Sequence, residues 1–458
     1  MEWTIAEIVE VTGGTLVKGS GSKTVSLFST DSRTAPPGSL FVPLEGPRFN
    51  GHQFIESAFR SGSVATLVKK GCGANGAGIA IEVADPLRAM QALAAETRRR
   101  FQGPVVGITG SNGKTTTKEM LGAILSMNGP ILKTEGNLNN HIGVPLTLLS
   151  LKKGDRLILL ELGINHPGEL RTLCEISRPT HGIITSIGES HLEGLGSLEG
   201  VADAKGELLD FLAGGTAFLN RDSPFYDRLA KRQKGKTVSF GLDLRSDVRG
   251  SDVRPGAGCV NFTLIFGKRE LPVRLALSGS HHVSNALGAA AVALALGIDL
   301  QSVAEGLERF RPAPLRSEWH RLSSGVQIIS DAYNANPTSM EAALRMLAEL
   351  GKIDERPTVA ILGDMLELGP VSDAAHYRLG KFAAALNIGR ILLIGKASES
   401  VLRGALDGGQ RKQDIEHFPD QQSLSSAARA LLKERPLILI KGSRGMKLER
   451  TLESLLKE

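Results

Sequence analysis

The sequence predicts an α/β protein in which parallel sheets recur in about three domains. Apolar runs of strand length alternate with helical patterns from about residue 102 to 312, and the alternation resumes beyond residue 314. Such alternation is typical of parallel sheets covered by helices. The chain of 458 residues also exceeds the size of a single typical core, and its length fits about three domains.

Breaks in this pattern place the expected domain boundaries. Residues 1–101 mix short strands and helices and close with a helix from Pro86 to Phe101. Residues 102–313 hold the main alternating segment, and residues 314–458 have the pattern of a Rossmann-like, doubly wound sheet. Pro312 and Pro314 separate these last two segments, because paired prolines disfavour a continuing helix.

Composition excludes several classes of protein. The net charge of +6 is spread thinly and aromatic residues make up only 4% of the chain, which argues against nucleic-acid binding. Cys72, Cys174 and Cys259 are odd in number and widely spaced, so neither a disulfide framework nor a zinc site is expected. The N-terminus lacks a signal-peptide core, and the longest apolar stretch, residues 286–298, is too short to span a bilayer. We expect a cytoplasmic monomer without a membrane span.

The stretch from Pro104 to Lys118 predicts a nucleotide phosphate site. It has the order of a buried strand, a turn containing Gly110 and Gly113, and the start of a helix. Glycines let backbone N–H groups close around phosphate oxygens, and the helix N-terminus adds a positive partial charge. Lys114 can then reach the terminal phosphates, and Thr115 can ligate magnesium. The pattern suits ATP, with a plain tight turn as the alternative.

Polar residues follow the strands of the middle segment at the point where each strand ends. Glu161 follows the run Leu157–Leu160, and His191 comes shortly after the run Gly182–Ile187. In open α/β sheets ligands collect at this edge, so these groups are expected to converge on the nucleotide. Glu161 and His191 are therefore candidate magnesium ligands. For either residue alone, an ordinary position in a surface loop is the alternative.

The period of the pattern changes between about residues 233 and 280. Three runs, Thr237–Phe240, Cys259–Phe266 and Leu271–Leu277, have the character of antiparallel strands and predict a small β insertion. An alanine-rich helix follows and ends at Leu296. Asn285, near its start, has two interpretations: a contact to a nucleotide base, or ordinary helix capping.

The strands of the last segment also end in polar groups. The run Asp331 to Asn336 follows one strand, Asp364 follows another, and Lys441 to Arg444 follows a third. An acidic loop at this edge of the sheet suits an amine substrate, and a basic loop at the same edge suits an anionic substrate. The alternative is ordinary solvated loop charge.

Motifs spread over nearly the whole chain resemble those of the Mur ligase family. The phosphate loop in the form Thr-Gly-Ser-Asn-Gly-Lys-Thr marks the family. The other motifs that carry the resemblance are Asp31-Ser-Arg33, Gly51-His52, Asn137-Leu-Asn-Asn140, Glu161-Leu-Gly-Ile-Asn-His166, Ala204-Lys-Gly-Glu207, His282-Val-Ser-Asn-Ala286, Asp331-Ala-Tyr-Asn-Ala-Asn-Pro337, Leu362-Gly-Asp-Met-Leu-Glu-Leu-Gly369 and Lys441-Gly-Ser-Arg444.

The resemblance implies a role for each matched residue. The UDP end of a precursor would bind on the first domain at Ser32, Arg33 and His52, with Asn139 and Asn140 near its sugar-peptide part. ATP would bind on the second domain at Thr109, Gly110, Ser111, Asn112, Gly113, Lys114, Thr115, Thr116, Asn285 and Arg316. The incoming amine would meet the third domain near Asp331, Asn334, Asn336, Asp364 and Arg444. Magnesium ions would be held by Thr115, Glu161, His191 and Lys205, the last as a carbamate. Lys114, Lys205 and His191 would be the catalytic residues.

The resemblance also implies a reaction. The C-terminal motifs are similar to those of the family member that uses ATP and Mg²⁺ to join D-alanyl-D-alanine to UDP-MurNAc-tripeptide, in the synthesis of the peptidoglycan cell wall. Three alternatives stay open from the residues: a family ligase that adds a single amino acid, a folylpolyglutamate-synthase-like ligase, and a P-loop module without ligase activity.

Overall fold

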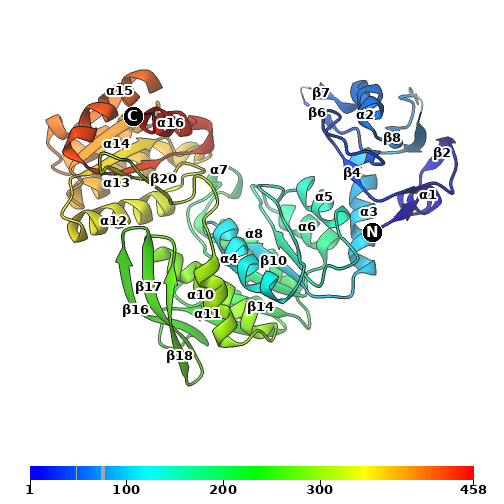
Figure 1. Cartoon of the computed structure of the whole chain (residues 1–458), viewed down its shortest axis with the longest axis horizontal. Helices are drawn as coiled ribbons and strands as arrows, with labels where there is room; N and C mark the ends of the chain where they lie inside the picture. The colour runs from blue at the N-terminus through cyan, green and yellow to red at the C-terminus, as the bar shows by residue number, and fades with distance from the viewer. Residues whose placement is uncertain (48, 74–77, 458) are drawn as a thin grey trace.

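The computed structural model describes residues 1–47, 49–73 and 78–457. Figure 1 shows three bodies in a bent arrangement, with the first and the third on opposite sides of the middle one. Each body contains its own main sheet, and the three sheets fall in the segments 15–83, 105–275 and 318–441. The result is a three-domain α/β architecture.

The first domain holds a small mixed sheet with the strand order β2-β9-β8-β5-β4. β2 is antiparallel to β9, while the other neighbours are parallel. The described elements are β1 Trp3–Thr4, α1 Ile5–Thr12, β2 Thr15–Lys18, β3 Thr24–Val25, β4 Phe28–Ser29, β5 Leu40–Phe41, β6 Glu45–Gly46, β7 Phe49–Asn50, η1 Gly51–Phe54, α2 Ile55–Ser61, β8 Ala65–Lys69, β9 Ile79–Val83 and α3 Pro86–Arg100.

Helix α3 joins the first domain to the second. Asp85 caps it by accepting hydrogen bonds from the backbone N–H groups of Leu87 and Arg88, and Pro86 occupies its first turn. Its apolar face, which includes Leu93, packs on α1 and on α5 (Gly143–Leu149) and α6 (Glu169–Ser177) of the second domain. One apolar core therefore runs through both domains, and the helix is a packed connection rather than a free linker.

The second domain is built on a sheet with the order β11-β12-β10-β13-β14-β15-β16-β17-β18. The strands from β11 to β16 are parallel, and β10 is buried along its whole length. The elements not yet given are β10 Val105–Thr109, α4 Lys114–Leu125, η2 Ser126–Asn128, β11 Leu132–Lys133, β12 Ile158–Glu161, β13 His181–Ile184, α7 Leu192–Leu195, α8 Leu198–Asp210, β14 Thr216–Asn220, α9 Tyr226–Arg232, β15 Lys236–Gly241, β16 Val248–Gly256, β17 Cys259–Phe266, β18 Arg269–Leu275, α10 His281–Ala295 and α11 Leu300–Arg309.

The β-rich segment of this domain is present but differs in pairing from the expectation. The run Thr237–Phe240 lies in β15, which is parallel to β14 rather than antiparallel to a neighbour. Only β16, β17 and β18 form an antiparallel unit, and it continues the main sheet. Residue periodicity shows that a strand exists but not which edge it joins, which explains the difference.

The third domain has a sheet with the order β19-β20-β24-β21-β22-β23, parallel except for β19 at one edge. Its elements are β19 Glu318–Arg321, β20 Gln327–Asp331, α12 Pro337–Ile353, β21 Thr358–Gly363, η3 Gly369–Val371, α13 Ser372–Ala385, β22 Arg390–Ile394, α14 Ser398–Asp407, η4 Lys412–Asp414, β23 Ile415–Phe418, α15 Gln421–Leu431, η5 Leu432–Glu434, β24 Leu437–Lys441, η6 Arg444–Met446 and α16 Glu449–Leu455. Across the described residues of the chain, none of the helices has the length and apolar character that crossing a membrane requires.

Candidate active site

The loop between β10 and α4 has the geometry of a phosphate cradle. Gly110 and Gly113 have φ angles of +146° and +83°, and a Cβ atom at either would lie about 2 Å from a neighbouring side-chain oxygen, that of Thr185 or Asn285. Only glycine fits at these two positions. Because Gly113 is the N-cap of α4 and carries no side chain, the first backbone N–H groups of the helix stay open for an anion.

Hydrogen bonds to residues 185–188, the segment after β13, hold the outer part of this loop. Ser111 donates from its backbone N–H to Ser186 O (2.8 Å) and from Oγ to Gly188 O (2.9 Å). The Asn112 carbonyl accepts from the hydroxyls of Thr185 (2.5 Å) and Ser186 (3.1 Å). The loop is thus preorganised by its neighbour and needs little rearrangement to bind phosphate.

Lys114 is half-buried at the floor of the loop. Its Nζ donates to Gly110 O at 2.7 Å, so the side chain folds back over the place where phosphate oxygens would lie. Burial lowers the pKa of Lys114, the carboxylate of Glu161 partly restores it, and Arg316 lowers it further. Two cations held near each other in this way favour a polyanionic ligand.

The carboxylate of Glu161 is the centre of a buried polar cluster. Glu161 is only 2% exposed, and its oxygens accept from Thr115 Oγ1 and from Asn139 Nδ2, both at 2.8 Å. Its backbone N–H donates to Thr134 Oγ1 at 3.0 Å. The Thr115 hydroxyl and the Glu161 carboxylate supply oxygen ligands of the kind that Mg²⁺ prefers.

Lys118, one helical turn after Lys114, supplies the counter-charge to this cluster. It is fully buried, and its Nζ lies 3.1 Å from Glu119 Oε1 and 3.8 Å from Glu161 Oε2. The same atom donates to Thr134 O at 2.7 Å. A buried carboxylate needs such a partner, since an unpaired charge in the interior is costly.

His191, at the start of α7, and Lys205, on α8, are both near enough to Lys114 for its charge to act on them. The positive charges of Lys114 and Lys205 both lower the pKa of His191, in addition to burial. Lys205, on α8, is 1% exposed, and burial together with Lys114 lowers its pKa well below that of a free lysine. No described residue raises the pKa of Lys205 in compensation.

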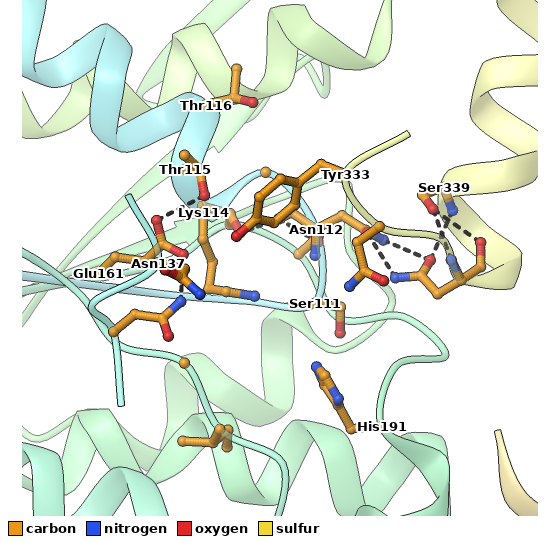
Figure 2. A pocket seen from close by; sticks show the side chains of 18 of the residues that line it. Ser111, Asn112, Lys114, Thr115, Thr116, Asn137, Glu161, His191, Tyr333 and Ser339 are labelled. Carbon is orange, nitrogen blue, oxygen red and sulfur yellow. Dashed lines mark hydrogen bonds between the residues drawn. The ribbon is translucent and has the colours of Figure 1, made fainter. Parts of the chain in front are cut away.

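Lys114, Thr115, Glu161 and His191 face one cavity of about 830 Å³ between the second and third domains, whereas Lys205 lies outside its lining. Figure 2 shows Lys114, Thr115, Asn137 and Glu161 grouped together, with the ring of Tyr333 beside Lys114 and the imidazole of His191 below them in this view. Of the predicted ATP-site residues, those that line the cavity are Ser111, Asn112, Gly113, Lys114, Thr115, Thr116, Asn285 and Arg316. Thr109 and Gly110 lie behind this lining, at the end of β10.

Residues of the third domain form the other wall. Arg316 stacks on Tyr333, with its guanidinium carbon 3.9 Å from the ring centroid. Asp331 forms an ion pair with the buried Lys441, which also donates to Asn334 O at 3.2 Å. The predicted residues Asp331, Asn334 and Asn336 line the cavity together with Lys441, which the sequence interpretation left without a role.

Two predicted residues of the third domain lie away from the cavity lining. Asp364 is buried and accepts three hydrogen bonds from Ala397 and Ser398 inside its own domain. Arg444 is 56% exposed and pairs with Glu449 at 3.3 Å. Their contact with the amine substrate stays a prediction.

The residues predicted to bind the UDP precursor divide into two groups. Asn139 and Asn140 line the cavity; Asn139 holds Glu161, while Asn140 accepts from the backbone of Ile142 and Gly143 at the start of α5. The first-domain residues lie outside the cavity and occupy local contacts. Ser32 O accepts from Ser61, Arg33 pairs with Asp31, and His52 Nε2 accepts from the Lys69 N–H.

The sequence interpretation assigned no individual role to four residues of the site, three of which stand in motifs quoted above. Lys118 and Lys441 are buried lysines, and Tyr333 and Glu367 come from the third domain. Lys118 could have been recognised from the sequence as a buried lysine, because it stands at a core-facing position of an apolar helix beside Met120 and Leu121. The partners of Tyr333 and Glu367 depend on how the domains meet, which local patterns do not encode.

Comparison with known proteins yields matches over the whole chain. Residues 108–293 match the Mur ligase middle domain, and residues 315–444 match the Mur ligase, glutamate ligase domain. The UDP-N-acetylmuramoyl-tripeptide–D-alanyl-D-alanine ligase of Bacillus subtilis strain 168 is 36% identical over 459 residues, covering 99% of this chain and 98% of that protein.

Solved structures agree with the sequence relatives. A crystal structure of MurF from Acinetobacter baumannii superposes with a TM-score of 0.92 at 32% identity, covering 100% of this chain and 99% of that one. A MurF ligase from Thermotoga maritima, solved in complex with ADP, has a TM-score of 0.83 at 26% identity and covers 94% of this chain and 97% of that one.

Proposed function

We propose a function from one premise: the chain belongs to the Mur ligase family, whose middle and glutamate-ligase domains match most of its length. It is an ATP-dependent ligase, and its reaction is the joining of D-alanyl-D-alanine to UDP-N-acetylmuramoyl-tripeptide in peptidoglycan synthesis. Relatives of this activity match the chain end to end, so neither a single-amino-acid ligase, nor a folate ligase, nor a non-enzymatic P-loop module is favoured.

One structural observation supports an ATP-driven ligation over a P-loop module without ligase activity. A single cavity is lined on one side by the phosphate loop with Glu161 and on the other by Asp331, Asn334 and Lys441 of the third domain. An enzyme that activates a carboxylate with ATP and then joins it to an amine needs both halves at one place. The cavity supplies a phosphate-binding wall and a separate polar wall for the second substrate.

We propose the following roles in the reaction. The terminal carboxylate of the tripeptide attacks the γ-phosphorus of ATP, and the bond between the γ-phosphorus and the β-phosphate oxygen breaks. An acyl phosphate and ADP result. Lys114 and the open N–H groups of α4 stabilise the charge on the transferring group. The amine of D-alanyl-D-alanine then attacks the acyl carbon, loses a proton, and expels phosphate as the amide forms.

Magnesium binding is part of the proposal. Thr115 Oγ1 and the Glu161 carboxylate fit this ion because both supply oxygen ligands, and the His191 imidazole lines the same cavity as a nitrogen ligand. When bound, Mg²⁺ would neutralise phosphate charge during transfer. A charged Lys205 would oppose it, so we propose that the neutral amine of Lys205 adds to CO₂. A new N–C bond forms, a proton leaves, and an anionic carbamate replaces the cation.

The remaining assignments concern the UDP end of the substrate, the contacts to the nucleotide and the amine, the cellular compartment and the oligomeric state. We propose that the UDP end binds at Ser32, Arg33 and His52 of the first domain, with the sugar-peptide part reaching the cavity past Asn139 and Asn140. Asn285 and Arg316 would contact the nucleotide, with Asp364 and Arg444 on the amine side. The enzyme would act as a cytoplasmic monomer, and the three cysteines are free, as a reducing compartment requires.

A reconstitution assay tests the proposal. Purified protein is given ATP, Mg²⁺, D-alanyl-D-alanine and UDP-MurNAc-tripeptide ending in either diaminopimelate or lysine. We expect phosphate release and a pentapeptide product by mass spectrometry with at least one tripeptide. Single amino acids or glutamate in place of the dipeptide should give no product; a product with these and none with the dipeptide would assign a sister ligase. Nucleotide binding without any product would instead favour a P-loop module without ligase activity.

A further inference from the structure

Two loops from different domains meet directly at the predicted magnesium ligand His191. His191 Nδ1 lies 2.6 Å from Glu367 Oε2 of the third domain. The backbone N–H of Glu193 donates to Glu367 O at 3.4 Å. A Cβ atom on Gly369 would lie 3.3 Å from Glu193 Cα, so the two backbones are in close contact as well. The side-chain pair therefore belongs to a packed junction.

The chemistry of this pair determines which imidazole nitrogen is free. An ionised carboxylate can only accept a hydrogen bond, so the His191 Nδ1 must carry a proton and donate it. In a neutral imidazole the lone pair then lies on Nε2, the nitrogen that remains for a metal. Partners of this kind orient metal-binding histidines and select their tautomer.

The backbone at both residues fixes the direction of the two side chains. His191 and Glu367 have φ angles of +51° and +62°, in the left-handed region that residues with a side chain seldom adopt. Such conformations persist where the surroundings hold them and are frequent at functional sites. Glu367 is also 58% exposed, so this pair contributes little to folding stability. Orientation of His191 is the better explanation for the arrangement.

We propose that Glu367 is a positioning residue for His191. When the third domain docks on the second, the Glu367 carboxylate fixes the imidazole tautomer and its direction, so that Nε2 points into the cavity. The third domain thereby completes the metal site as it delivers the amine substrate. This inference rests on the proposed function, in which His191 binds magnesium.

A matched pair of variants separates positioning from docking. Glu367→Ala removes the acceptor for Nδ1, while Arg378→Ala removes another contact between the same domains, the Arg378–Glu189 ion pair at 3.1 Å. Mn²⁺ binding to the protein in the presence of ADP is measured by electron paramagnetic resonance. We expect a roughly tenfold weaker Mn²⁺ affinity in Glu367→Ala and no change in Arg378→Ala. Equal weakening in both variants, or none in Glu367→Ala, would overturn the proposal.

Three further measurements complete the test. In a His191→Ala background, Glu367→Ala should have no additional effect on Mn²⁺ affinity, because no imidazole is left to orient; a persisting effect overturns the proposal. Glu367→Gln keeps an acceptor oxygen and should restore most of the affinity. In assays, Glu367→Ala should raise the Mg²⁺ concentration for half-maximal activity roughly tenfold with little change in the KM for D-alanyl-D-alanine. A wild-type protein without ligase activity would refute the proposed function. The Mn²⁺ affinities of the variants would still test the role of Glu367.

Discussion

Asn112 of the phosphate loop and Asn336 of the third domain exchange hydrogen bonds through both ends of their side-chain amides. Asn336 Nδ2 donates to Asn112 Oδ1 at 2.8 Å, and Asn112 Nδ2 donates to Asn336 Oδ1 at 3.3 Å. Asn336 also caps α12 by accepting from the Ser339 N–H at 2.9 Å. The loop that would hold the ATP phosphates is thus tied directly to the start of a third-domain helix, and this pair links nucleotide binding to the position of that domain.

The amide pair predicts non-additive effects on catalysis. Asn336→Ser keeps a capping side chain but is too short to reach Asn112, and Asn112→Ala removes the other partner. We expect each variant to lower kcat/KM for D-alanyl-D-alanine about tenfold, the equivalent of one interdomain hydrogen-bond pair. The double variant should lose no more than the worse single variant, because both changes break the same contact. Losses that multiply would show that the two residues act independently.

Two lysines that share one carboxylate predict very different losses of stability. Lys118 and Lys133 both pair with Glu119, but Lys118 is fully buried and also faces Glu161, while the Lys133 side chain is 36% exposed. Lys118→Met leaves the buried Glu161 carboxylate without its lysine partner, and we expect a cost of about 3–5 kcal/mol in urea unfolding. Lys133→Met should cost less than about 1 kcal/mol. Similar midpoints for the two variants would contradict this account of the buried cluster.

The parts of the site that could be predicted from sequence are those that local rules determine. The phosphate loop follows from Gly110 and Gly113 between a buried strand and a helix, since only glycine fits their conformations. Glu161 and His191 could be found because parallel strands bring their ends to one edge of a sheet. Lys205 has no such local signal, and its assignment came only from the resemblance to a family.

Contacts that depend on the relative position of domains or strands were not predictable. The partner of Glu367 is His191, 176 positions away in the chain, and no periodicity connects them. The same holds for β15, whose pattern predicted a strand but whose parallel pairing with β14 is decided by the sheet around it. Asp364 is a related case, because a polar residue after a strand serves equally well as an internal cap, which is how it is bonded here.

The histidine at the start of α10 predicts a pH dependence of stability. Burial lowers the pKa of His281 to about 4, with Asp331 and Lys441 acting in opposite directions on it. A histidine in the unfolded chain has a pKa of about 6.5. Between these values the unfolded state binds a proton that the folded state does not, so stability is lost as the pH falls from about 6.5 to about 4. The loss from this residue is up to about 3 kcal/mol.

Variants of two histidines check this dependence. His281→Gln should flatten the fall in thermal midpoint between pH 6.5 and pH 4, because its side chain does not titrate. His166→Gln, in an exposed position beside Glu169, serves as the control and should retain the wild-type slope. Identical slopes for wild type and His281→Gln would show that other groups dominate the acid response.

Lys205 predicts chemical rescue. Its buried amine lies near Lys114 and His191, where a cation is unfavourable and the proposed carbamate would supply an anionic metal ligand. We expect Lys205→Ala to lower kcat by about two to three orders of magnitude, the size of effect seen when a charge-stabilising group is removed. Formate, acetate or propionate should restore part of the activity by placing a carboxylate in the vacated space. Lys231→Ala, at an exposed position on α9, should be fully active and indifferent to these acids. Full activity of Lys205→Ala without any acid would remove Lys205 from the site.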